Sequence, residues 1–85
     1  MHTAELLKQA CETAGRLGYQ LRYDRLDGDG GICQIKGQKC IFIDLQASVA
    51  DQLALVVEAI QQEPATARAA LAPQLAQLVN ARQAA

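Results

Sequence analysis

The sequence lacks several features, and each absence excludes a class of protein. Its longest strictly apolar run, Leu53 to Val57, is far shorter than the roughly 20 residues that cross a bilayer. Eight basic and nine acidic side chains nearly cancel. The chain therefore has neither the composition of an acidic tail nor the basic surface that binds nucleic acid. No charged and then apolar leader follows Met1. We therefore expect a cytoplasmic protein that binds neither membrane nor nucleic acid.

Cysteine and histidine are also scarce. Cys11, Cys33 and Cys40 are an odd number without a Cys-x-x-Cys pair, which favours reduced thiols over a disulfide framework. Because free cysteine is usually buried, we expect Cys33 and Cys40 to pack in the core. Structural zinc sites pair their ligands a few residues apart, and the single histidine, His2, lies at the chain end. We therefore expect no metal, no cofactor and no cysteine–histidine catalytic pair.

What the sequence does contain is enough apolar surface for one small folded domain. The chain has 85 residues, of which 51% are hydrophobic, and this excludes a disordered tail. We divide this single domain into a core at 1–62 and an alanine-rich, helical C-terminal segment at 63–85. From residue 64 onward, the only charged side chains are Arg68 and Arg82.

Hydrophobic periodicity predicts a helix followed by three strands. Apolar residues recur at helical spacing from about Thr3 to Leu17, and Gly18 supplies a left-handed residue to end the helix. The period then becomes two over Tyr19 to Tyr23, which is typical of a strand with one buried face. Two further apolar runs, Ile32 to Lys36 and Lys39 to Leu45, predict the remaining strands.

A tight turn at Gly37-Gln38 is expected to join the last two strands into an antiparallel hairpin. This turn sets Ile35 opposite Cys40. It places one set of side chains on one face of the sheet: Cys33, Ile35, Cys40 and Phe42. The other face carries Ile32, Ile41 and Ile43. Because the third strand is apolar on both faces, we expect it to be central and covered on both sides.

Helix signals return in the second half of the chain. Ser48 and Asp51 form a variant capping box, which predicts a helix from there to about Gln62. Pro64 ends this helix, and Pro73 interrupts or starts another, whose apolar stripe consists of Leu71, Leu75, Leu78 and Val79. The predicted fold class is α+β: a helix, a three-stranded antiparallel sheet with a hairpin, then two C-terminal helices.

A glycine-rich loop from Asp27 to Gly31 is the most evident place for a ligand. It fails as a dinucleotide-binding fingerprint because Cys33 stands where the third glycine belongs, and no Gly-Lys-Ser/Thr makes it a P-loop. A calcium loop would place its first and last ligands on Arg25 and Lys36. A flexible connection between strands is the simpler interpretation. The candidates for ligand binding are Asp27, Asp29 and Cys33.

One region resembles the ImmA/IrrE-type zinc peptidases, in which a strand of the form I-x-I-N leads into a helix carrying H-E-x-x-H. Here the strand ends in Ile41-Phe42-Ile43-Asp44 and the helix contains Val56-Val57-Glu58-Ala59-Ile60-Gln61. Glu58 matches the general base, whereas Val57 and Gln61 stand in place of the zinc-binding histidines. The resemblance therefore implies a non-catalytic relative. The segment Gly30-Gly31-Ile32-Cys33 also resembles small uncharacterised bacterial proteins with a Gly-Gly-x-Cys hairpin, which implies no activity.

These observations favour a non-catalytic protein–protein interaction or self-associating module. The doubly apolar strand and the nearly uncharged C-terminal segment indicate surplus apolar surface. We expect a symmetric homodimer, or binding to another protein, with the C-terminal stripe at the interface; alternatively, this segment folds back onto its own chain. The interface candidates are Leu71, Leu75, Leu78 and Val79. The rival hypothesis is a small enzyme or ligand-binding protein that uses the acidic glycine-rich loop and the cysteine-bearing sheet face.

Overall fold

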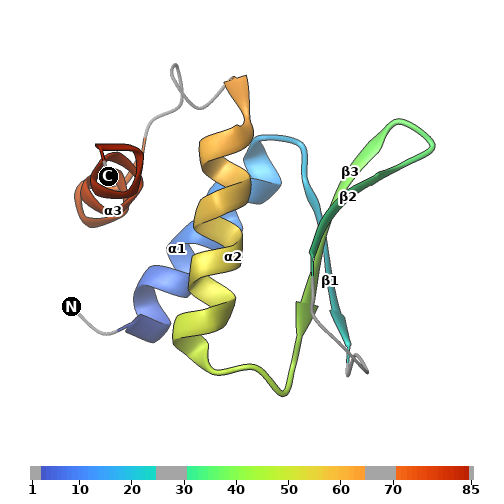
Figure 1. The fold of residues 1–85 in the computed structure, drawn as a ribbon, viewed down its shortest axis with the longest axis horizontal. Helices are drawn as coiled ribbons and strands as arrows, with labels where there is room; N and C mark the ends of the chain where they lie inside the picture. Colours follow the sequence, from blue (N-terminus) through green and yellow to red (C-terminus); the bar gives the residue numbers. More distant parts are fainter. Residues whose placement is uncertain (1–2, 25–30, 65–70, 85) are drawn as a thin grey trace.

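The computed structural model of the chain describes residues 3–24, 31–64 and 71–84. Figure 1 shows helices on one side of a small sheet. The elements follow in the order α1 (Thr3–Arg16), β1 (Gln20–Asp24), β2 (Gly31–Ile35), β3 (Gln38–Asp44), α2 (Val49–Gln62) and α3 (Pro73–Ala84). The α+β class and the predicted order of helices and strands are confirmed.

The ends of the helices follow the local signals in the sequence. Gly18 has a φ of 100°, a left-handed conformation that turns the chain out of α1. Ser48 caps α2, because its side-chain oxygen accepts a hydrogen bond from the Asp51 amide at 3.1 Å. Pro73 is the first residue of α3, where its missing N–H has no intrahelical partner to lose.

The prediction of an all-antiparallel sheet was wrong. The strand order is β1-β3-β2, and β1 pairs with β3 in parallel, while β2 pairs with β3 antiparallel. The predicted central position of β3 is confirmed. The two edge strands, β1 and β2, run in opposite directions, so β3, which is antiparallel to β2, runs parallel to β1. In the central position, the most apolar strand has hydrogen-bonded neighbours on both sides.

The hairpin turns one residue earlier than predicted. Lys36 and Gly37 occupy the turn with φ angles of 50° and 81°, so both adopt the positive φ of a type I′ turn. Ile35 therefore pairs with Gln38, and Cys33 pairs with Cys40. Each residue of β2 is therefore paired with a residue of β3 two positions away from the predicted partner. Because side chains alternate with a period of two, every side chain keeps the face that the sequence predicted.

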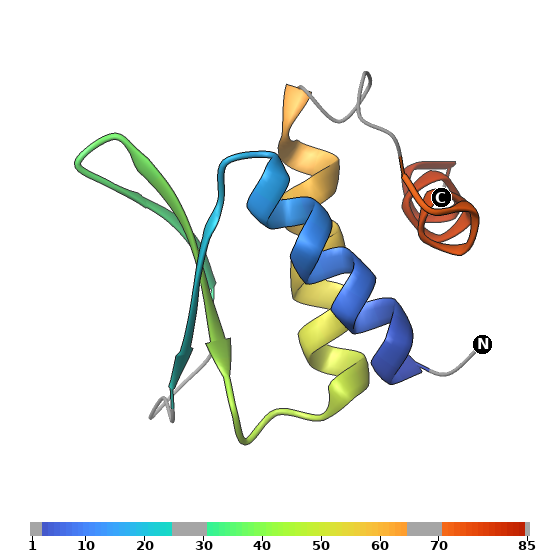
Figure 2. The same cartoon turned by 180° about the vertical axis from the view of Figure 1, so that it is seen from behind.

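The core lies between the sheet and the helices. α1 and α2 cover one face of the sheet, and α3 packs against these two helices on the side away from the sheet (Figures 1 and 2). The fully buried side chains of this core include Ile41, Ile43, Val56, Val57, Ile60 and Leu75. No described helix covers the second face of the sheet, so the expected cover on both sides of β3 is absent from the described residues.

Candidate functional site

One face of the sheet is covered by none of the described helices, and we call it the open face. Ile41 and Ile43 are buried against the helices, so the alternating side chains of Cys40 and Phe42 point the other way. The strand register then assigns the remaining members. The open face consists of Gln20, Arg22, Asp24, Gly31, Cys33, Ile35, Cys40, Phe42 and Asp44.

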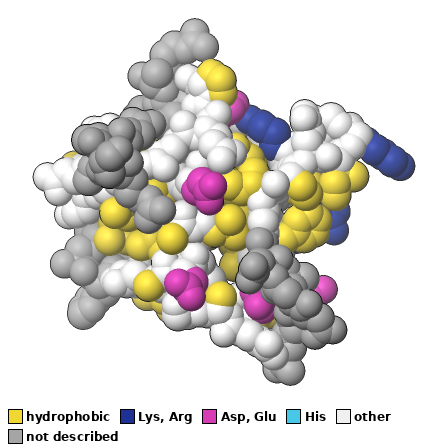
Figure 3. Space-filling model, in the orientation of Figure 1, with side chains coloured by type: hydrophobic (Ala, Val, Ile, Leu, Met, Phe, Trp, Pro, Cys, Tyr) yellow, Lys and Arg dark blue, Asp and Glu magenta, His cyan; other side chains and the backbone are white. Residues whose placement is uncertain are grey.

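The hairpin half of the open face is apolar, and two of its side chains, Ile35 and Cys33, are exposed. Ile35 keeps 47% of its surface exposed, Cys33 is exposed and Phe42 is half-buried. Figure 3 shows hydrophobic side chains gathered on the side of the sheet that faces away from the helices. Exposed apolar side chains that adjoin one another on one surface are typical of a binding site.

The expectation of two buried hairpin thiols was half wrong. Cys40, on the central strand β3, is only 2% exposed, whereas Cys33 lies on the edge strand β2 and is exposed. Cys11 on α1 is half-buried, and all three cysteines are free. Burial, with a hydrogen bond to Cys11 as the next cause, raises the pKa of Tyr23 to about 12.

The two edges of the sheet differ in charge. β1 carries Arg22 and Asp24, and charged side chains on an edge strand discourage pairing with another chain. β2 has the sequence Gly-Ile-Cys-Gln-Ile, with neither a charge nor a proline. Among the described residues, no strand pairs with its outer edge. β2 is therefore the less protected edge.

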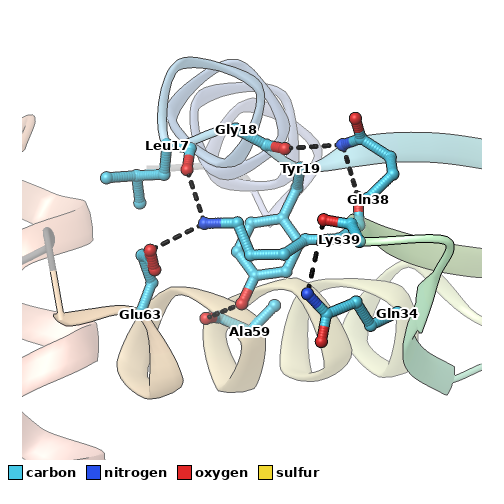
Figure 4. A network of polar contacts seen from close by, with 9 residues as sticks. Leu17, Gly18, Tyr19, Gln34, Gln38, Lys39, Ala59 and Glu63 are labelled. Atoms are coloured by element: carbon cyan, nitrogen blue, oxygen red, sulfur yellow. Dashed lines mark hydrogen bonds and ion pairs between the residues drawn. The ribbon is translucent and has the colours of Figure 1, made fainter.

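A polar network ties the sheet to both long helices (Figure 4). The Lys39 ammonium group donates to the Leu17 carbonyl at 2.8 Å and to Glu63 Oε1 at 2.6 Å. It also lies 4.8 Å from the centre of the Tyr19 ring. Lys39 thus satisfies a carbonyl just after α1, where the helix dipole favours a positive charge.

Tyr19 and Gln38 extend this network. The Tyr19 hydroxyl donates to the Ala59 carbonyl at 2.9 Å, and Gln38 Nε2 donates to the Gly18 carbonyl at 2.9 Å. Burial raises the pKa of Tyr19; the Lys39 ammonium opposes this shift and the Glu63 carboxylate adds to it. These contacts hold elements together. Sequence reasoning missed them, because the partners lie about 20 or more residues apart.

Of the three residues proposed for ligand binding, the structure describes only one. Asp27 and Asp29 lie outside the described residues, and Cys33 lies on the open face. Within residues 3–24, 31–64 and 71–84, no three His, Cys, Asp or Glu side chains group closely enough to hold a metal ion. A hollow on α1 is lined by Glu5, Lys8, Gln9 and Glu12. Its lining combines both signs of charge on one helix without a nucleophile.

The apolar stripe of α3 faces the chain's own core. Leu75 is 0% and Val79 2% exposed, and both belong to the main cluster of buried residues. Leu71 and Leu78 are partly buried against the same cluster. Gln61 on α2 adds a hydrogen bond of 2.9 Å from its side-chain amide to the Val79 carbonyl. In this position Leu75 and Val79 have no surface to offer a partner.

The positions that resemble the zinc peptidases have ordinary structural roles. Val57 is fully buried in the core, and the side chain of Gln61 is committed to α3. Glu58 lies exposed on α2, at 3.5 Å from the side-chain amide of Gln62. The strand before α2 is the central strand of the sheet. The relationship to that family stays a hypothesis.

The chain was compared with protein-family models, curated proteins and solved structures, and none of them matches it. None of the described helices is both long and apolar enough to span a bilayer.

Proposed function

We propose that the chain is a non-catalytic, self-associating protein-interaction module that binds through the hairpin side of its sheet. The observation that carries this proposal is the accessible apolar surface of β2 and β3, where Ile35 is 47% exposed beside the exposed Cys33. In a small domain the apolar side chains are needed for the core. When a partner covers apolar side chains that the sheet leaves exposed, the free energy of the system falls.

This surface replaces the C-terminal stripe as the proposed interface. The stripe is occupied by contacts within the chain, whereas no described helix reaches the open face. Arg22 and Lys36 border the apolar residues, and both are exposed. A polar border around an apolar centre is the usual composition of a protein–protein interface.

The test is the mass of the full chain in solution, measured by analytical ultracentrifugation from low to high micromolar concentrations. We expect a reversible dimer, weakened at least about tenfold by Ile35→Asp because a charge would be buried at the interface. Val49→Asp is the matched control. Val49 is 41% exposed, similar to Ile35, but it starts α2, where an acid favours the helix dipole.

Two results would overturn the proposal. One is a monomeric mass throughout the concentration range. The other is an equal loss of association in the Ile35→Asp and Val49→Asp variants, because the hairpin side of the sheet would then have no special part in it.

A further inference from the structure

We propose that two copies of this chain pair their β2 strands antiparallel about a two-fold axis at Cys33, which joins two three-stranded sheets into one sheet of six strands. The inference rests on the self-association proposed above and adds its geometry. It starts from the edge that the sheet leaves open, since β2 is paired on one side only among the described residues.

The turn determines which backbone groups of β2 point outward. In a two-residue turn, the carbonyl before the turn accepts a hydrogen bond from the amide after it, so Ile35 and Gln38 form a hydrogen-bonded pair. Such pairs alternate along an antiparallel ladder. The backbone amide and carbonyl of Cys33 therefore form their hydrogen bonds with β3. The amides and carbonyls of Ile32 and Gln34 point to the free edge.

Only one register uses the whole of this edge. When Cys33 of each copy lies on the axis, Ile32 of one strand pairs with Gln34 of the other. The outward groups of these residues then meet each other in hydrogen-bonded pairs. All five residues of Gly31–Ile35 are paired. An axis at Ile32 or Gln34 would leave residues at one end of each strand without a partner from the other strand.

The side chains fit this register. Ile35 lies opposite Gly31 of the other copy, and the glycine leaves space for the exposed isoleucine. No Cβ built on Gly31 would meet another described atom within 4 Å. The two Cys33 residues form a non-hydrogen-bonded pair, in which Cα atoms are about 4.5 Å apart. This separation lies within the range that a disulfide spans.

The other edge disfavours the same arrangement. Two β1 strands paired about their centre would place Arg22 opposite Arg22, and like charges directly opposite are destabilising. β2 brings no charge into the junction. Figures 1 and 2 also show the hairpin projecting away from α1 and α2, so these helices leave its turn end accessible. A contact of two short strands is small, and we expect a weak, reversible dimer.

The first experiment traps the pair on the full chain with oxidised glutathione. One Cys33 thiolate attacks the glutathione disulfide and releases a glutathione thiolate; the partner's Cys33 thiolate then displaces the second glutathione from the mixed disulfide. We expect a covalent dimer from the unmodified chain and none from Cys33→Ser, which retains Cys11 and Cys40. The double variants Cys33→Ser/Gln34→Cys and Cys33→Ser/Ile35→Cys report the register. Each should cross-link at least about tenfold more slowly, because its thiols lie farther from the axis.

The second experiment removes one outward hydrogen-bond donor. Gln34→Pro deletes an amide that points away from β3, so the hairpin ladder keeps its bonds. Gln34→Ala is the matched control, because it retains the amide and removes the same side chain. By symmetry, proline deletes two intermolecular hydrogen bonds. We expect the dissociation constant to rise at least about tenfold in Gln34→Pro and to change little in Gln34→Ala. Circular dichroism checks that both variants are folded.

The outcomes separate this inference from the proposed function. A dimer by mass that Gln34→Pro leaves intact, or that cross-links faster through residue 34 or 35 than through Cys33, overturns the strand pairing and leaves self-association standing. If Gln34→Pro does not fold, the relative trapping rates alone decide. A chain that is monomeric at every concentration overturns both proposals.

Discussion

The Lys39 side chain, on β3, contacts residues that follow both α1 and α2. Its ammonium group joins the end of α1 to the end of α2 from the first part of β3. The side chains of Lys39 and Glu63 are 32% and 14% exposed, so their ion pair is partly removed from water. Such a pair is stronger than a fully exposed one, and the Tyr19 ring adds a cation–π contact to the ammonium group.

The residue-scale prediction follows from these contacts. Lys39→Met keeps the apolar stem and removes the charge, leaving Glu63 and the Leu17 carbonyl without their donor. We expect the free energy of unfolding to fall by about 1–3 kcal/mol in urea denaturation. Lys8→Met, at an exposed lysine of α1, is the control and should change it by less than about 0.5 kcal/mol. Equal losses in the two variants would show that Lys39 is an ordinary surface lysine.

At the scale of an element, the hairpin depends on two positive φ angles. Gly37 adopts a φ of 81° without the steric cost of a Cβ. Lys36 adopts a φ of 50°, which is uncommon for residues other than glycine, asparagine and aspartate. The turn therefore has one residue suited to its conformation and one that is strained.

The hairpin prediction uses both positions. Gly37→Ala should lower the free energy of unfolding by about 1 kcal/mol through backbone strain alone, because its added Cβ meets open space. Lys36→Asn should raise it by several tenths of a kcal/mol, because Asn-Gly is the preferred type I′ pair. Gly15→Ala is the matched control. A Cβ at Gly15 would also meet open space, but Gly15 lies in α1. Because alanine has a higher helix propensity than glycine, this substitution should raise the free energy of unfolding. Thermal denaturation that gives the same sign for both Gly→Ala variants would refute the turn assignment.

At the scale of the whole molecule, three layers follow one another: the sheet, the pair α1 and α2, and α3. α1 and α2 are therefore buried on two sides, by the sheet and by α3. Leu75 and Val79 complete this second contact from α3. The layers make the C-terminal helix part of the folding unit of a single chain.

Leu75→Ala tests this arrangement. Removing a fully buried leucine leaves a cavity, so we expect a loss of about 2–5 kcal/mol in the free energy of unfolding. Gln77→Ala, at an exposed position of the same helix, should have little effect. The loss should be the same at every protein concentration. If it instead appears only as weaker association, α3 packs on a partner rather than on its own chain.

The sequence by itself determined the features that depend on near neighbours. Periodicity identified the helices and strands, Ser48 and Gly18 marked helix ends, and alternation assigned each hairpin side chain to the correct face. These signals are local because capping, left-handed turns and strand pleating involve residues only a few positions apart. An error of one residue in the turn did not change the faces, because both registers share the same alternation.

Only the tertiary structure decided what depends on distant residues. It paired β1 with β3 in parallel, and it put α3 against the helices rather than the sheet. It joined Lys39 to Glu63 and exposed Cys33 at an edge while burying Cys40 in the centre. Composition and spacing do not determine these features, because strand direction, helix packing and side-chain pairing depend on contacts between residues far apart in the sequence. The choice comes from the apolar area that the complete arrangement removes from water.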